Sequence, residues 1–187
     1  LYKEPDNYRT KLEAILQVSE DTSRASWELF KLARKDDFDS FRKISIYFSR
    51  KFDDAQTDEY KSYLIKKFKT DSSSSVRVAI VNTIYNIWRD DSSLISFYKK
   101  ASLDSSVNVK LNALEIINII AREDALLLAN EFEKETDPRI ISHLARMYSS
   151  IKDESKSKWF NWAIKQVEYR DKSYVISRYL KYLLEKD

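Results

Sequence analysis

The segments DSSSSVRVAIVNTIYNIW (residues 71–88) and DSSVNVKLNALEIINIIA (residues 104–121) repeat one pattern within the chain. Each opens on an aspartate, passes through serines to a valine with a basic neighbour, and ends in an apolar run with helical spacing. Asp71 and Asp104 lie 33 residues apart, and a third turn led by an aspartate, Asp137, follows after another 33. A repeat of this length is typical of stacked units that bury each other's apolar faces, so the stretch predicts a repeat architecture.

Apolar residues recur every three or four positions along the rest of the chain, which is the spacing of helices with one buried face. The alternating pattern of β-strands is absent, and the short turns between the predicted helices favour antiparallel neighbours. We therefore expect an all-α protein of about eleven helices, a right-handed α-solenoid that forms one domain over residues 1–187. The predicted helical segments are 8–18, 25–35, 38–48, 60–69, 76–88, 94–101, 109–120, 125–132, 141–148, 159–167 and 173–184.

Polar residues in the turns are expected to cap these helices, because their side chains can accept hydrogen bonds from the free backbone N–H groups of the first turn. Asp6 or Asn7 is predicted to cap the first helix, and Asp21 or Thr22 the second. The hydroxyls of residues 72–75 are expected to do the same for the helix that follows them.

Three sets of residues are predicted to be buried from their helical spacing. The buried face of the second helix is predicted to consist of Ala25, Leu29, Leu32 and Ala33. The tryptophans predicted as core residues are Trp27, Trp88, Trp159 and Trp162. The last helix is expected to seal the exposed end of the stack with Tyr179, Tyr182, Leu183 and Leu184.

The composition excludes several classes of site. Glycine is absent, although dinucleotide fingerprints, phosphate-binding loops, serine-nucleophile turns and EF-hand loops need it for positive φ or close backbone approach. Cysteine is absent too, so neither disulfides nor thiolate metal sites can form. The net charge is +3 with acids and bases interspersed, which indicates a solvated surface. No apolar run has the length of a transmembrane helix, so we expect no membrane partner.

The titratable residues form no catalytic or metal-binding constellation, and we predict no catalytic, cofactor-binding or metal-ligating residue in this chain. His143 is the only histidine; it lacks the partners of a zinc site or a catalytic triad and is predicted to be solvated or half-buried. Two acidic groups are predicted to be surface or capping residues. They are Glu131, Glu133 and Glu135, and Asp36, Asp37 and Asp39.

Basic pairs recur along the first half of the chain, where a superhelix could align them into a stripe for nucleic acid. Acidic residues interrupt the series, and the tryptophans that could stack on bases have the spacing of core residues. We therefore do not expect a nucleic acid partner. The pairs are Arg34-Lys35, Arg42-Lys43, Arg50-Lys51 and Lys66-Lys67.

The order of aspartate, valine, arginine and a small or apolar residue in the turns resembles HEAT repeats, which belong to the armadillo-like superhelices. The matching sets are Asp71, Val76, Arg77 and Ile80; Asp104, Val109, Lys110 and Ala113; and a shorter copy, Asp37, Phe41, Arg42 and Ser45. The resemblance implies that the aspartate and the basic residue pair between neighbouring units, which is a structural role.

A narrower resemblance covers nearly the whole chain. It rests on the opening run, with Tyr8-Arg9, Glu13-Ala14, Asp37-Phe38 and Phe41-Arg42, and on FEKETDPRIISHLARMYSSIKD (residues 132–153). These features resemble the C-terminal HEAT-like domain of bacterial aminopeptidase N-like zinc metallopeptidases. The resemblance implies a non-catalytic domain that packs on the catalytic domain and restricts peptide access. The zinc ion, the His-Glu-x-x-His helix and the Gly-x-Met-Glu-Asn loop belong to that other domain, so no cofactor is expected in this chain.

Two functional hypotheses follow. In the first, the chain is a domain excised from a zinc aminopeptidase, whose catalytic domain is its partner; a first residue other than Met favours this hypothesis. In the second, it is a free-standing HEAT-repeat scaffold that binds another protein along its concave face.

Overall fold

The computed structural model describes residues 8–151 and 153–186, and within these ranges the regular secondary structure is helical, without a β-strand. The predicted all-α fold is confirmed, and the eleven α-helices of the described ranges match the expected number. The chain divides into two compact units, unit 1 up to Ala101 and unit 2 from Ser102. The helix packing within each unit is consistent with a helical solenoid. The right-handed superhelix and the single domain stay predictions.

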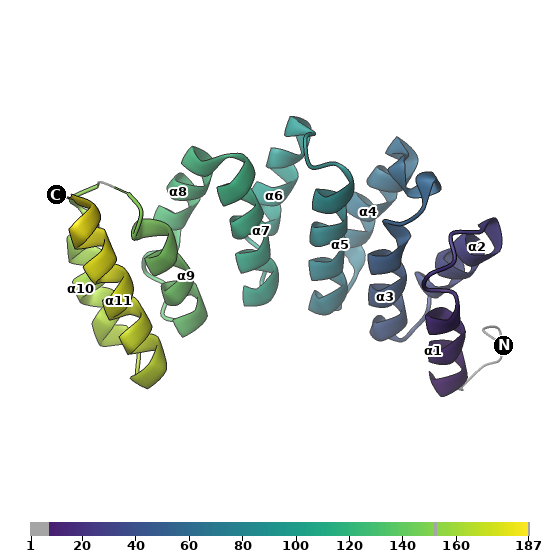
Figure 1. Cartoon of the computed structure of the whole chain (residues 1–187), viewed down its shortest axis with the longest axis horizontal. Helices are drawn as coiled ribbons and strands as arrows, with labels where there is room; N and C mark the ends of the chain where they lie inside the picture. Colours follow the sequence, from purple (N-terminus) through teal and green to yellow (C-terminus); the bar gives the residue numbers. More distant parts are fainter. Residues whose placement is uncertain (1–7, 152, 187) are drawn as a thin grey trace. The chain divides into compact units, whose positions relative to one another are not determined.

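Unit 1 stacks its helices in two rows (Figure 1). One row holds α1, α3 and α5, and the other holds α2, α4 and α6. Within this unit α3 packs on α2 and α5, and α4 packs on α5. The elements are α1 (Tyr8–Gln17), α2 (Arg24–Ala33), α3 (Asp39–Ser49), the 3₁₀ turn η1 (Asp53–Gln56), α4 (Asp58–Thr70), α5 (Ser74–Ile87), the 3₁₀ turn η2 (Ser92–Leu94) and α6 (Ile95–Ala101).

Unit 2 follows the same plan. Here α7 packs on α8 and α9, and α11 packs on α9 and α10. No described helix is both long enough and apolar enough to span a bilayer. The elements are α7 (Val107–Ile120), α8 (Arg122–Glu131), α9 (Pro138–Tyr148), α10 (Lys156–Gln166) and α11 (Tyr169–Lys186).

The helix α5 shows how the repeat sequence produces a buried element. Val76, Ile80 and Ile84 are spaced by four residues, lie on one face and are fully buried. Thr83 is buried beside them, and its hydroxyl donates to the carbonyl of Ile46 in α3 at 3.3 Å. The buried hydroxyl of this helix therefore has a partner on the neighbouring helix α3, as buried polar groups require.

The prediction for the tryptophans is confirmed for two of them. Trp27 is buried, with its ring 5.2 Å from that of Phe52, and Trp159 is buried, with its ring 5.0 Å from that of Tyr148. Trp88 and Trp162 are half-buried.

The pairing expected between neighbouring repeats is confirmed for Arg42 and Asp71. Nε and Nη2 of Arg42 donate to the two carboxylate oxygens of Asp71 at 2.8 and 2.9 Å. Nη1 of Arg42 donates to the carbonyls of Asp36 and Asp37 at 2.9 and 2.7 Å. The guanidinium of Arg42 therefore binds the turn at the start of its own repeat and also Asp71, the first residue of the next repeat. Such bidentate, charge-assisted bonds combine strength with a fixed geometry.

Asp71 is buried at this junction and stays ionised. Burial by itself would raise the pKa of Asp71, but hydrogen bonds from Arg42 and Lys67 outweigh burial and lower the pKa to about 2. Because the pKa is lowered on folding, the pair contributes stability above about pH 4, the pKa range of an unfolded aspartate, and loses it as the pH falls toward 2.

Equivalent links join other neighbours with other chemistry. Lys11 binds Asp36 at 2.8 Å, and Lys110 binds Glu135 at 3.0 Å. The acceptor for Lys110 is thus the glutamate that precedes the Asp137 turn, while Asp137 itself accepts from Arg139 within its own turn at 2.8 Å. The repeat pattern identified the basic position but not always the acid that pairs with it.

The serine turn behaves differently from the prediction. Ser73 is the N-cap of α5, but its side chain accepts no capping hydrogen bond from the backbone N–H groups of the helix. Its hydroxyl and that of Ser75 donate instead to Asp39 of the preceding repeat, at 2.7 and 3.3 Å. Asp71 accepts from the backbone N–H of Ser73 at 3.0 Å. Ser73 and Ser75 therefore link two repeats, while Asp71 accepts from a backbone N–H of the turn.

The cap predicted for α2 was wrong by one or two residues. Ser23 is the N-cap and accepts from the N–H of Ser26 at 3.4 Å, whereas Asp21 accepts from both serine hydroxyls. Asp6 and Asn7, predicted to cap the first helix, lie outside the described residues.

The predicted buried face of α2 is confirmed for Ala33 and wrong for Ala25 and Leu32, which are exposed, while Leu29 is half-buried. The residues of α2 that are buried are Ser26, Trp27, Phe30 and Ala33. The buried face of α2 differs from the predicted one because the large aromatic side chains of Trp27 and Phe30 bury more apolar surface than Leu29 and Leu32 would.

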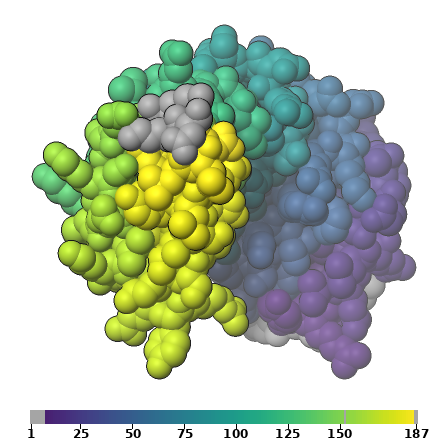
Figure 2. Space-filling model, turned by 60° about the vertical axis from the view of Figure 1, so that its left-hand side comes forward, coloured from purple at the N-terminus to yellow at the C-terminus, as the bar shows by residue number. Residues whose placement is uncertain are grey.

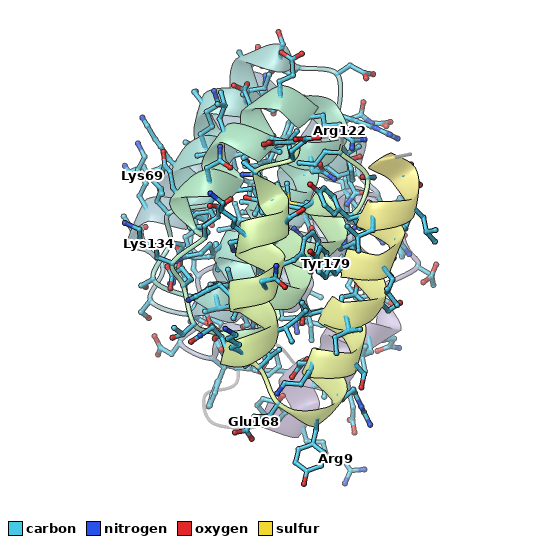
Figure 3. All side chains as sticks on the ribbon, turned by 90° about the vertical axis from the view of Figure 1, so that its left-hand side faces the viewer. Arg9, Lys69, Arg122, Lys134, Glu168 and Tyr179 are labelled. Atoms are coloured by element: carbon cyan, nitrogen blue, oxygen red, sulfur yellow. The ribbon has the colours of Figure 1, made fainter. Side chains whose placement is uncertain are left out.

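Four residues of α11 were predicted to cover the end of the stack, and two of them, both tyrosines, pack inward. Tyr182 is fully buried, and Tyr179 (labelled on α11 in Figure 3) has a ring that stacks on that of Phe160 of α10. The two ring centroids are 5.0 Å apart. Leu183 and Leu184 are exposed, Leu184 by 77%. The tyrosines take the inner face of the helix, which turns the leucines outward.

We predict that Arg42→Met lowers the free energy of unfolding by about 3 kcal/mol, because removing one member of a buried ion pair leaves the other charge buried. Urea denaturation followed by circular dichroism measures the change. Lys43→Met, on the adjacent exposed lysine, is the control and should change stability by less than about 0.5 kcal/mol. Equal losses in the two variants would contradict a structural role for the pair.

Candidate functional site

A groove of about 900 Å³ opens within unit 1 between α2, η1 and α4. Its centre is Arg34, the residue that ends α2, whose side chain lies among three aromatic rings. The guanidinium carbon lies 4.8 Å from the ring centres of Trp27 and Tyr60, and 5.0 Å from that of Tyr63. Such distances are those of cation–π contacts.

Two helices assemble this cluster. Trp27 and Arg34 are seven residues apart, so they lie two turns apart on one face of α2. Tyr60 and Tyr63 are three apart on α4, and their rings stack with centroids 5.9 Å apart. The edge of Trp27 meets Tyr60 at 5.5 Å, which joins the two helices.

Arg34 is buried without an ion-pair partner among the described residues. It is 6% exposed, and its Nε makes no hydrogen bond in the described part of the chain. The position favours a cation, because the C-terminal end of α2 carries the negative end of the helix dipole. A buried guanidinium without a carboxylate is nevertheless costly, which makes Arg34 unlike Arg42, whose charge Asp71 neutralises.

The rim of the groove carries opposite charges on its two sides. On the α2 side lie Arg24, Lys31 and Lys35, together with Glu28, which pairs with Lys31 at 2.5 Å. On the side of η1 and α4 lie Asp53, Asp54 and Glu59. The groove therefore offers both signs of charge around an apolar, aromatic floor.

The two tyrosines of the groove keep their phenol protons. The hydroxyl of Tyr60 donates to Ser49 at 2.6 Å. Burial raises the pKa of Tyr60 and of Tyr63, so both phenols stay protonated at neutral pH. Of the hydroxyls that line the groove, Ser23 donates to the carboxylate of Asp21 at 2.7 Å, and Thr57 donates to the backbone carbonyl of Asp54 at 3.3 Å.

The acidic residues considered from the sequence serve separate structural contacts. Asp36 binds Lys11, and Asp39 accepts from Ser73. Glu133 accepts from Lys156 at 2.6 Å. Over the described ranges, no group of three histidine, aspartate or glutamate side chains is placed to hold a metal ion.

The basic pairs also separate in the structure. Arg34 lines the groove, Arg42 and Lys67 both bind Asp71, and Lys51 binds Glu20 at 2.9 Å. These members of the series are therefore engaged in different local contacts.

Sequence reasoning missed the groove because it grouped Arg34 with Lys35 by charge. A usable signal existed: Trp27 and Arg34 at seven-residue spacing, followed by Tyr60 and Tyr63 at three-residue spacing on a later helix. That signal becomes visible only when α2 and α4 are known to be adjacent.

Comparison of the sequence with models of known protein families gives no match, and comparison with curated proteins gives none either. The resemblance to aminopeptidase C-terminal domains therefore stays a prediction.

His143 lies on α9 in unit 2 with its side chain 12% exposed, as the half-buried prediction anticipated. Its Nε2 lies 3.6 Å from a carboxylate oxygen of Glu115 and makes no hydrogen bond among the described residues. Arg146 takes that same carboxylate in an ion pair. Burial and the nearby Arg146 charge lower the pKa of His143 to about 4, against the opposing effect of Glu115.

We predict that His143 makes the protein less stable as the pH falls from 7 to 5. The unfolded histidine binds a proton near pH 6.5, whereas the folded one does so only near pH 4, so acid favours unfolding in this window. Urea unfolding of the wild type should lose about 2 kcal/mol more than His143→Gln between these pH values. Parallel pH profiles for the two proteins would show that the buried imidazole is not responsible.

Proposed function

We propose that this chain is a non-catalytic helical-repeat module that binds a segment of a protein partner, and that the groove of unit 1 receives a carboxylate of that segment beside Arg34. The observation that carries the proposal is the buried guanidinium of Arg34, held by three rings and lacking a carboxylate among the described residues.

A carboxylate entering the groove would gain more from Arg34 than from a surface cation. Arginine presents a planar fork that matches a carboxylate, and a contact removed from water is screened less. The rings of Trp27 and Tyr60 fix the guanidinium before binding, so little side-chain entropy remains to be lost.

The rim adds a preference for a segment of mixed charge. A carboxylate near Arg34 can be accompanied by a basic side chain facing Asp53, Asp54 and Glu59. The two charged sides of the groove would then set the direction in which the segment lies.

Selection from a random library of twelve-residue peptides tests the proposal. Peptides selected on the wild-type chain should be enriched in Asp and Glu, and their affinity, measured by fluorescence anisotropy, should fall at least tenfold in Arg34→Met. Replacing the selected Asp or Glu by Asn or Gln should have a similar effect on the wild type and almost none on the variant.

Two further variants keep this test informative. Arg34→Lys retains the charge but not the fork and should bind with intermediate affinity. Lys43→Met, an exposed residue outside the groove, should bind as the wild type does. If the Arg34 variants have wild-type circular dichroism and bind the selected peptides with wild-type affinity, the proposal is overturned.

A second candidate function is supported by an apolar face on α11. Ile176, Leu180 and Leu184 are spaced by four residues and exposed, and Figure 2 shows α11 (yellow) at the surface of unit 2. An exposed apolar face suits a protein contact. In the aminopeptidase hypothesis, this face would pack on the catalytic domain of the longer protein.

That hypothesis has a direct test in the gene sequence upstream of residue 1. It predicts a His-Glu-x-x-His helix there. It also predicts that Leu180→Asp leaves the isolated chain folded, while weakening its association with the separately expressed catalytic domain. A parent protein without the zinc helix would remove the hypothesis.

A further inference from the structure

A smaller cavity, of about 220 Å³, lies within unit 2 between α7, α9 and α11. Four cations line it, Arg122, Arg146, Arg178 and Lys181, and no carboxylate does so among the described residues. Figure 3 shows Arg122 near the C-terminal end of α11. Residues from distant parts of the sequence thus bring like charges to one small space.

The charges of this cluster are only partly neutralised. Arg146 forms an ion pair with Glu115, and Lys181 lies 3.9 Å from Glu185 in a half-exposed pair. Arg122 donates to the carbonyl and the hydroxyl of Ser150, at 3.1 and 2.9 Å. These hydrogen bonds satisfy polar groups just after the end of α9. They leave the charge of Arg122 without a counter-ion among the described residues.

Arg178 is the least satisfied member. Its Nε is buried and makes no hydrogen bond among the described residues, and no described carboxylate is within ion-pair distance of its guanidinium. Its guanidinium carbon lies 4.7 Å from the ring centre of Tyr174, on the same helix. The ring holds the charge in place without supplying a hydrogen-bond acceptor.

The cluster has two unfavourable features, the repulsion among its cations and the unbonded Nε of Arg178, and an anion in the cavity would offset both. It would lower the repulsion among the cations and give Nε of Arg178 the acceptor that a buried donor needs. A phosphate group fits this cluster better than a carboxylate. It carries close to two negative charges at neutral pH and has three strong acceptor oxygens, which arginine forks can bind in pairs.

We propose that this cavity is a phosphate-binding site in which Arg178, Arg122 and Lys181 hold the phosphate oxygens. The site is separate from the groove of Arg34, and its test is independent of the peptide selection.

Inorganic phosphate and the full chain provide the primary experiment. At constant ionic strength, kept with chloride, phosphate in the millimolar range should raise the melting temperature of the wild type in a saturable way. Isothermal titration calorimetry gives the dissociation constant. Arg178→Met should weaken binding at least tenfold, and Lys181→Gln several-fold.

The controls separate a specific site from general charge effects. Lys165→Gln, on an exposed lysine of α10 outside the cavity, removes the same charge and should leave phosphate binding unchanged. Lys181 is half-exposed, so its variant remains informative even if Arg178→Met is poorly folded. The proposal is overturned if phosphate causes no saturable shift, or if Lys165→Gln weakens binding as much as Lys181→Gln does.

Once phosphate binding is shown to depend on Arg178, further experiments identify the molecule that carries the phosphate group. Phosphoserine peptides compete with inorganic phosphate if the carrier is a protein. Vesicles containing a phosphoinositide, compared with vesicles of phosphatidylcholine alone, retain the wild type but not Arg178→Met if the carrier is a lipid headgroup. Binding of free phosphate alone assigns the site to a soluble anion.

Discussion

The bond between Arg42 and Asp71 is the contact through which one repeat determines the position of the next. The same guanidinium binds the carbonyls of Asp36 and Asp37 in its own turn, so the turn and its neighbour are fixed together. Apolar faces alone would let helices slide along each other, because apolar packing has little directional preference. The bidentate ion pair of Arg42 and Asp71 restricts that sliding where these two repeats meet.

Lys11 with Asp36 and Lys110 with Glu135 are further links between repeats, and two arginines differ from them. Arg34 and Arg178 are guanidiniums that aromatic rings hold in place and that no described carboxylate neutralises. Both line cavities, one in each unit. Each unit therefore has a cavity lined by an arginine whose charge no described carboxylate neutralises, and both proposals rest on these two arginines.

The sequence predicted the helices because they depend on local spacing. The resemblance to HEAT repeats, and not the period itself, predicted that a basic residue such as Arg42 pairs with the aspartate of a neighbouring repeat, and Asp71 is that aspartate. The buried face of α2 could not be predicted, since Leu29 and Leu32 have the same spacing as Trp27 and Phe30. Packing against α3, Phe52 and α4 decides which pair is buried. The site at Arg34 depended on that face and was therefore missed. The cavity at Arg178 was missed for a related reason, because it needs three helices to be placed first.

The links between repeats also bear on how the chain acquires its structure during synthesis. Lys11 and Asp36 are 25 residues apart, Arg42 and Asp71 are 29 apart, and Lys110 and Glu135 are 25 apart. Each pair can form soon after its second member leaves the ribosome, without waiting for the end of the chain. Low separation between contacting residues favours fast folding and shortens the exposure of apolar surface. The order of translation is thus the order in which the stack can be built.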